Sequence, residues 1–233
     1  MKGADSLPGF AVGGYQAFSA SDWPDRLAAV VFTQGCPLRC GYCHNPHLIP
    51  RGPGSIAFDD VLRNLDARRS LLDGVVFSGG EPCAQHGLPR AIDAVRDLGL
   101  RVGLHTAGTF PLMLARILKR LDWIGLDVKA PPGRFAEVTA VSAWRRVEES
   151  LAILVRGESE FEVRTTWAPS LFPESELFDL AQMLSGRGVA NYALQCLRRP
   201  VDSTGMMRWE PGPAPSAATL DRLASCFTRM TLR

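Results

Sequence analysis

The chain has 233 residues, 46% apolar and 21% charged, a composition typical of a folded globular protein and a length that suits one α/β domain. Its 26 basic and 24 acidic residues give a net charge of +2, so charge gives no reason to expect nucleic acid or an acidic membrane as a partner. No apolar run approaches the roughly 18 residues that cross a bilayer, and the first ten residues lack the apolar core of a secretory signal, so we expect a cytoplasmic protein with a single domain over residues 1–233.

Apolar, β-branched runs alternate along the chain with longer segments of helical periodicity, which is the pattern of β-α-β units in a parallel sheet. Residues 1–27 form an extension before the first unit. The expected strands are residues 28–33, 74–78, 101–106, 123–128, 161–166 and 191–195. The expected helices are residues 58–72, 88–98, 111–121, 143–155, 175–184 and 219–230. A segment rich in proline and glycine, residues 198–215, is expected to form an irregular loop over one end of the sheet.

Three of these strands carry polar residues on one face, which is unusual for strands covered by helices. The residues that share a face, two positions apart, are Asp127 with Lys129, Glu162 with Arg164 and Thr166, and Asn191 with Gln195. Burying an unpaired charge in a packed core is very costly. We therefore expect an incompletely closed barrel, a partial (β/α)6 barrel with a parallel six-stranded sheet, whose polar lumen binds a ligand. Internal ion pairs or exposed strand ends are the alternative.

Three cysteines follow the first expected strand with the spacing C-x3-C-x2-C. Cys36, Cys40 and Cys43 can hold an iron–sulfur cluster and leave one iron without a protein ligand, whereas an electron-carrying cluster is normally closed by four thiolates. Gly35 and Gly41 indicate a loop around the metal and disfavour a helix. A zinc site completed by His44 is the alternative at this point.

A turn, Ser78-Gly-Gly-Glu-Pro82, follows the second expected strand, at the end where barrel enzymes build their sites. The glycines let a ligand approach the backbone closely, and the Glu81 carboxylate can accept hydrogen bonds from an ammonium group. The same sequence in isolation is also a common turn. Its position one β-α unit after the cysteines favours a binding role.

Together, Cys36-x3-Cys40-Gly-Tyr-Cys43 and Gly79-Gly80-Glu81-Pro82 resemble the motifs of the radical S-adenosylmethionine (SAM) superfamily. The resemblance extends over nearly the whole chain. Other segments are similar to the activating enzymes of glycyl-radical proteins, above all those of anaerobic ribonucleoside-triphosphate reductase: Ser21-Asp-Trp-Pro24, Cys43-His-Asn-Pro46, Leu104-His-Thr-Ala-Gly108, Trp123-Ile-Gly-Leu-Asp-Val-Lys-Ala130 and Tyr192-Ala-Leu-Gln195.

This resemblance implies an enzyme with a [4Fe–4S] cluster and SAM as cofactors. An electron from the reduced cluster would cleave the sulfonium C–S bond of SAM to give a 5′-deoxyadenosyl radical, which would abstract hydrogen from a glycine of a partner protein. Anaerobic ribonucleotide reductase is the implied partner, and reduced flavodoxin or ferredoxin the implied electron donor.

The resemblance also implies roles for individual residues. Cys36, Cys40 and Cys43 would be the cluster ligands. The implied SAM-binding residues are Tyr42 beside the adenine, Gly79, Gly80 and Glu81 at the methionine amino group, Thr106, Asp127 and Lys129 near the methionine and ribose, and Arg164 and Gln195. His105 stands where an aspartate often precedes the threonine, and Gln195 where a histidine is familiar, so the metal-ion site of the pyruvate formate-lyase type is in doubt here.

Other functions stay open at the level of sequence. The same radical chemistry can act directly on a small molecule, as in the 7-carboxy-7-deazaguanine synthases, or on a pyruvate formate-lyase-type protein. A non-catalytic iron–sulfur or zinc protein for binding or electron transfer is the alternative outside enzymes. The glycine turn and the polar strand faces count against it, because neither is needed to hold a metal.

Overall fold

The computed structural model describes residues 7–203 and 206–233. Its main sheet has eight strands in the order β1, β2, β3, β4, β5, β6, β7, β10. Strands β2 to β7 run parallel in chain order, and β1 joins one edge antiparallel while β10 joins the other edge parallel. The strands are β1 Val12–Ser19, β2 Ala28–Thr33, β3 Gly74–Gly79, β4 Arg101–Thr106, β5 Trp123–Asp127, β6 Glu160–Trp167, β7 Asn191–Cys196 and β10 Arg229–Leu232.

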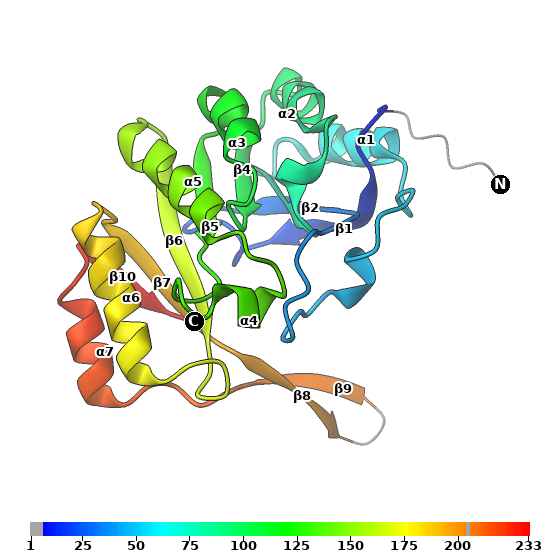
Figure 1. Ribbon diagram of the computed structural model, residues 1–233. Helices are drawn as coiled ribbons and strands as arrows, with labels where there is room; N and C mark the ends of the chain where they lie inside the picture. Colours follow the sequence, from blue (N-terminus) through cyan, green and yellow to red (C-terminus); the bar gives the residue numbers. More distant parts are fainter. Residues whose placement is uncertain (1–6, 204–205) are drawn as a thin grey trace.

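The helices follow the strands along the outer side of the curved sheet (Figure 1). They are α1 Phe58–Arg68, α2 Leu88–Asp97, α3 Pro111–Ile117, α4 Phe135–Thr139, α5 Trp144–Arg156, α6 Glu174–Gly186 and α7 Ala217–Ala224, with 3-10 turns η1 Pro46–Leu48, η2 Pro82–Ala84 and η3 Leu118–Arg120. The predicted α/β class with six parallel core strands is therefore confirmed. In the described part of the chain, no helix has the length and apolar character needed to cross a membrane.

Alternate residues of the strands face two different cores. Val75 and Phe77 of β3 belong to the large core between sheet and helices, while Val76 between them joins a small inner cluster with Trp23 and Trp123. The two indole rings stack at 5.8 Å on the concave side of the sheet. A methyl group at Gly103 of β4 would lie 3.0 Å from Trp23, so the ring rests directly on the strand backbone. The tryptophans thus fill the inside of the barrel beside the polar strand ends.

Two edge elements were not expected from the sequence. The extension 1–27 contributes β1, whose Gly13 and Gly14 weaken the local strand signal. The predicted helix 219–230 is wrong beyond Ala224, because the chain turns and β10 pairs with β7. The ring of Phe227 stacks on Tyr192 at 4.6 Å, so a tertiary contact outweighs the helical periodicity at this edge.

The segment 198–215, expected to be an irregular loop, contains two strands. β8 Arg198–Ser203 and β9 Met206–Pro211 pair as an antiparallel ribbon that stands apart from the main sheet (Figure 1). Pro200 and Pro211 lie within these strands. Both strands of a two-stranded ribbon have a free edge, where a residue without an amide hydrogen is tolerated. The proline content therefore marked an isolated ribbon and not a loop.

The inner tryptophan cluster yields a stability prediction. Trp23 is 5% exposed, and we expect Trp23→Ala to lower the free energy of unfolding by about 3–5 kcal/mol, because a buried indole leaves a cavity when it is removed. Leu112→Ala is the matched control, since that side chain is 87% exposed. Chemical denaturation of the purified variants measures both. Equal stabilities of the two variants would contradict this packing role.

Candidate active site

The three predicted cluster cysteines lie on a loop that folds back onto its own start. Gly35 adopts a φ of +98° and its amide donates to Leu48 O at 2.8 Å, and the Cys36 amide donates to Ile49 O at 3.0 Å. Positive φ values are costly for residues with a side chain. These bonds close the loop, and Cys36, Cys40 and Cys43 line one cavity of about 260 Å³ as free thiols.

The donor set fits an iron–sulfur cubane. Such a cluster carries its ligands on separate iron atoms, so its cysteines surround a space and need not meet at one point. Among the residues that the structure describes, no three His, Cys, Asp or Glu side chains converge on the position of a single metal ion. The cavity extends from the thiols to the ends of β3, β4 and β5, which leaves room for a further ligand. Burial raises the pKa of the Cys36 thiol to about 11, so binding as thiolate releases a proton.

The glycine pair after β3 lies against the start of the cysteine loop. The Gly80 amide donates to Thr33 O at 2.9 Å, and the Glu81 amide donates to Gly35 O at 3.0 Å. A Cβ atom would lie 2.4 Å from Thr33 N at Gly79 and 2.3 Å from Gly35 O at Gly80. Two backbones therefore touch where any side chain would separate them. The glycines serve this contact as well as lining the cavity.

Glu81 has a different place from the one that its sequence motif suggests. Its side chain is 1% exposed, and it accepts hydrogen bonds from Thr106 Oγ1 at 2.7 Å and from the amides of Cys83 at 3.0 Å and Ala107 at 2.8 Å. Burial raises the pKa of this carboxyl, while these three donors lower it. Within the protein, Glu81 thus joins the glycine turn to the end of β4. A carboxylate with about four acceptor positions has little capacity left for a ligand.

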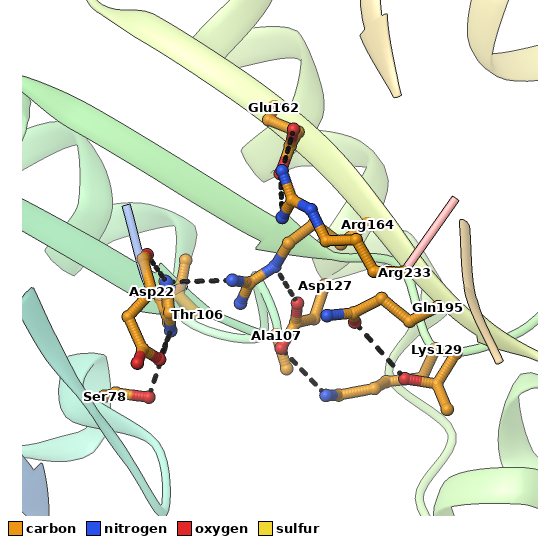
Figure 2. A network of polar contacts seen from close by, with 12 residues as sticks. Asp22, Ser78, Thr106, Ala107, Asp127, Lys129, Glu162, Arg164, Gln195 and Arg233 are labelled. Atoms are coloured by element: carbon orange, nitrogen blue, oxygen red, sulfur yellow. Dashed lines mark hydrogen bonds and ion pairs between the residues drawn. The ribbon is translucent and has the colours of Figure 1, made fainter. Parts of the chain in front are cut away.

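A partly buried ion-pair network joins the carboxyl end of β5 to Arg164 of β6 (Figure 2). Asp127 Oδ1 accepts from Arg164 Nε at 2.7 Å, and its Oδ2 accepts from Lys129 Nζ at 3.0 Å. Burial alone would raise the pKa of Asp127, but the guanidinium of Arg164 and the ammonium of Lys129 hold it below its usual range. For Lys129 the signs are reversed: burial lowers the pKa of the ammonium group, but the Asp127 carboxylate raises it by more, so the pKa lies above its usual value. Two cations thus face one anion inside the cavity.

His105 joins this network as a neutral base. Its Nε2 lies 2.8 Å from Arg164 Nη1, and its Nδ1 lies 3.1 Å from Ser78 Oγ. A guanidinium only donates and a carbonyl oxygen only accepts, so in a given tautomer Nε2 pairs with either Arg164 or the Asp22 carbonyl, and not with both. Burial and the charge of Arg164 lower the pKa of His105 to about 3. The Asp22 carbonyl oxygen also lies 2.7 Å from Nε2, so the N-terminal extension closes this side of the cavity.

Tyr42 contributes a buried hydroxyl to the same wall. Its Oη has no hydrogen-bond partner among the described residues, which is unusual because buried polar atoms are normally paired. Burial raises the pKa of this hydroxyl. An orphaned donor in the cavity that holds the three thiols is consistent with a site shaped for a bound group.

The structure brings nearly all of the predicted site residues together. Those lining the cavity are Cys36, Cys40, Tyr42, Cys43, Gly79, Gly80, Thr106, Asp127, Lys129, Arg164 and Gln195. Glu81 lies behind the wall and acts through Thr106. Sequence reasoning did not select Asp22, Ser78, His105 and Thr166, which also line the cavity. Thr166 shares a strand face with Arg164, and Ser78 opens the glycine turn. Asp22 precedes the first parallel strand and appears in the sequence only within the segment Ser21-Asp-Trp-Pro24.

Comparisons with known proteins relate this chain to the radical SAM superfamily. The sequence profile of that superfamily matches residues 30–163, which include the cysteine loop, the glycine turn and the ends of β4 and β5. A protein of Methanocaldococcus jannaschii, whose name describes a candidate glycyl-radical enzyme activating enzyme, is 25% identical over 192 residues, 79% of this chain and 78% of that protein. The pyruvate formate-lyase-activating enzyme of Clostridium pasteurianum is 35% identical over 109 residues, which is 44% of this chain and only 46% of that enzyme.

Solved structures share the fold at low sequence identity. QueE from Escherichia coli superposes with a TM-score of 0.51 at 16% identity, covering 96% of this chain and 90% of QueE. SuiB from Streptococcus suis, bound to its precursor peptide SuiA, gives a TM-score of 0.65 at 15% identity over 87% of this chain and 48% of SuiB. These similarities support the partial barrel that the sequence predicts.

The buried neutral His105 predicts a pH dependence of stability. An unfolded histidine takes up a proton near pH 6.5, whereas folded His105 stays neutral down to about pH 3. Protons therefore favour the unfolded state, and the free energy of unfolding of the wild type, relative to His105→Gln, should fall by about 1.4 kcal/mol per pH unit below about 6.5. Denaturation curves at pH 7, 6 and 5 measure it. Parallel pH profiles for the two proteins would contradict it.

The saturated carboxylate of Glu81 predicts that even an isosteric amide is harmful. In Glu81→Gln, one of three donors faces an NH2 group, so we expect a loss of about 1–3 kcal/mol in the free energy of unfolding. Glu158→Gln, on an exposed side chain, is the control and should change stability by less than about 0.5 kcal/mol. Chemical denaturation at pH 7 compares them. A Glu81→Gln variant as stable as the control would show that these bonds contribute little.

Proposed function

The chain belongs to the radical SAM superfamily, and we propose that it generates a glycyl radical on a partner protein. Members of the superfamily use a [4Fe–4S] cluster held by three cysteines together with SAM, and these supply a 5′-deoxyadenosyl radical by reductive cleavage of the sulfonium C–S bond. The observation that carries the proposal is that three free thiols and the ion-pair network of β5 and β6 line one cavity. That network is not needed to hold a cluster, which favours an enzyme over an electron carrier. Because members of the superfamily bind an iron–sulfur cluster at these cysteines, we propose the cluster in place of a zinc site completed by His44.

Each side of the cavity suits one part of SAM. Lys129 and Arg164 carry N–H donors at this side of the cavity, and the donors not used by Asp127 suit the methionine carboxylate. The backbone carbonyls of Gly79 and Gly80 suit the ammonium group. The residues proposed to hold the cofactors are Cys36, Cys40 and Cys43 for the cluster, and Tyr42, Gly79, Gly80, Thr106, Asp127, Lys129, Arg164 and Gln195 for SAM. Glu81 is proposed as a residue that positions Thr106.

The ion pairs also limit what else this side of the cavity binds. Arg164 occupies the space between Asp127 and His105, and its guanidinium already neutralises the carboxylate. A cation placed there would meet two protein cations. We therefore propose that SAM binds here without an additional metal ion.

Anaerobic ribonucleotide reductase is the proposed partner. The support is the similarity of several segments, including Cys43-His-Asn-Pro46, to its activating proteins. The names of the relatives found by comparison support a glycyl-radical protein in general. A pyruvate formate-lyase-type protein and a small molecule, as for the deazaguanine synthases, are the competing substrates. Reduced flavodoxin or ferredoxin is the proposed electron donor, and the need for a strong reductant supports a cytoplasmic location.

Anaerobic SAM cleavage tests the first half of this function. After cluster reconstitution and reduction with dithionite, we expect 5′-deoxyadenosine and methionine in equal amounts from the wild type. Cys40→Ala should bind less iron and release at least about a hundredfold less 5′-deoxyadenosine, because the cluster loses one of three ligands. Chromatography quantifies both products. Wild-type product no higher than in the variant, at full iron content, would refute the enzyme assignment.

Electron paramagnetic resonance tests the second part of the proposed function, the formation of a glycyl radical on a partner protein. Co-incubation with anaerobic ribonucleotide reductase, SAM and reductant should give a glycine-centred signal that needs both proteins. A pyruvate formate-lyase-type protein serves as the parallel sample. A signal only in that sample would reassign the partner, and SAM cleavage coupled to conversion of a deazaguanine precursor would move the enzyme to the small-molecule class.

A further inference from the structure

We propose that the protein has a separate docking surface for an acidic electron-donor protein, located over a hollow on the outer side of the Cys36 loop. The inference rests on the proposed function, because only a reduced cluster needs such a donor. It identifies where the donor binds and which residue attracts it. We call this surface the donor hollow and define it by Gly9–Ala11, Gln34–Pro37, Arg51–Gly52 and Ala84–His86.

Cys36 connects the donor hollow with the active-site cavity. It lines both spaces, and Gly35 and Pro37 on either side of it line the hollow. A partner seated in the hollow therefore lies one cysteine away from the proposed cluster without entering the SAM cavity. The other two thiols, of Cys40 and Cys43, line the active-site cavity. Cys36 is thus the ligand through which an electron has the shortest path from this surface.

The charge of the donor hollow selects an acidic partner. Its lining contains Arg51 and His86 and no carboxylate, and the run of sequence from Gln34 to Ala57 contains no Asp or Glu. Arg51 is exposed and, within residues 7–203 and 206–233, forms no ion pair. Arg39 is also exposed and lies on the same loop, but its guanidinium donates hydrogen bonds to the carbonyl oxygens of Cys36 and Leu38. A partner with carboxylates would find an unneutralised cation here.

A second surface hollow shows that this charge pattern is not general. That hollow lies along α5 and contains two glutamates, which pair as Glu148 with Arg187 and Glu149 with Arg145, and a third arginine, Arg156. Unlike the donor hollow, it therefore includes carboxylates in its lining. With an overall net charge of only +2, the chain has no broad positive field. The attraction at the donor hollow is therefore local and depends mainly on Arg51.

The floor of the donor hollow is held in place by hydrogen bonds, so the surface exists before a partner arrives. Gln34 Nε2 donates to His47 O at 3.0 Å and to Pro50 O at 2.7 Å. Gln85 accepts from the Ala11 amide at 3.0 Å and donates to Gln34 O at 2.5 Å. The stem of Arg51 passes over Gly35, where an added Cβ would lie 3.4 Å from Arg51 Cγ. The backbone around Cys36 is therefore ordered before the partner docks, which lowers the entropy lost on docking.

The step that this surface serves is a one-electron transfer. The donor is oxidised by one electron and the cluster is reduced by one, and no atom or proton changes partner. Small anionic reductants such as dithionite can supply the same electron without a docking surface. The ratio of protein-driven to dithionite-driven SAM cleavage therefore isolates the contribution of the donor hollow from that of the active site.

Charge reversal at Arg51 tests the proposal. With reduced flavodoxin as the probe at low ionic strength, Arg51→Glu should lower the ratio of flavodoxin-driven to dithionite-driven 5′-deoxyadenosine formation by about tenfold. Arg51→Lys should keep the wild-type ratio, because it keeps the charge. Arg116→Glu, an exposed arginine on α3, makes the same change in net charge away from the hollow and should also keep it. The wild-type ratio should fall as salt is added, while that of Arg51→Glu changes little.

The outcomes separate this inference from the proposed function. No SAM cleavage with dithionite would refute the function itself. Normal dithionite-driven cleavage with an unchanged flavodoxin ratio in Arg51→Glu would refute the donor hollow alone. A loss confined to glycyl-radical formation would assign the surface to the substrate protein, and a change in oligomeric state would assign it to a second copy of the chain; either result overturns the proposal. Iron content and thermal midpoint, measured for each variant, must match the wild type for the comparison to count, and Arg51→Ala replaces any variant that fails this check.

Discussion

The close backbone contact between the ends of β2 and β3 is the constraint on which the site depends. Glycines at 79 and 80 allow the turn to lie against Thr33 and Gly35, and two amide hydrogen bonds fix the contact. The cysteine loop begins at the same point. From the turn, the buried carboxylate of Glu81 reaches the end of β4. Three strand ends are thereby locked together before any cofactor binds, so the position of the thiols relative to the SAM-binding wall is a property of the fold.

The charged residues of β5 and β6 determine which groups the cavity wall across from the cysteine loop can bind. Asp127 would be costly to bury alone, and Lys129 and Arg164 together more than offset its charge. Because burial and the charge of Arg164 keep His105 neutral, the imidazole contacts Arg164 without adding charge. The result is a network of paired charges facing the cavity, with the Asp22 carboxylate beside it. Its N–H donors are held in place before an anionic group binds.

Much of the fold and site was predictable because it depends on local periodicity and on short motifs. The parallel strands appear in the sequence as apolar runs, and Asp127 with Lys129 reveals the wet side of the barrel by spacing alone. Features that depend on distant contacts were not predictable. β1 and β10 exist because open sheet edges offer hydrogen bonds, and Asp22 reaches the site only through the path of the N-terminal extension. The hydrogen bonds of Glu81 to Thr106, Cys83 and Ala107 were likewise not predictable, because a motif does not show which donors the fold supplies.

The two faces of the cysteine loop give SAM, a substrate protein and an electron donor separate places on one small barrel. SAM needs the inner face of the cysteine loop, and the glycine of a protein substrate must reach the radical through the mouth of the same cavity. Beside the cavity, the inside of the barrel is filled by the stacked rings of Trp23 and Trp123. The proposed donor hollow lies on the other side of the loop, and Cys36 lines both this hollow and the cavity. With the donor docked there as proposed, the donor and a substrate protein would reach the cluster from different sides, so neither would have to leave before the other acts.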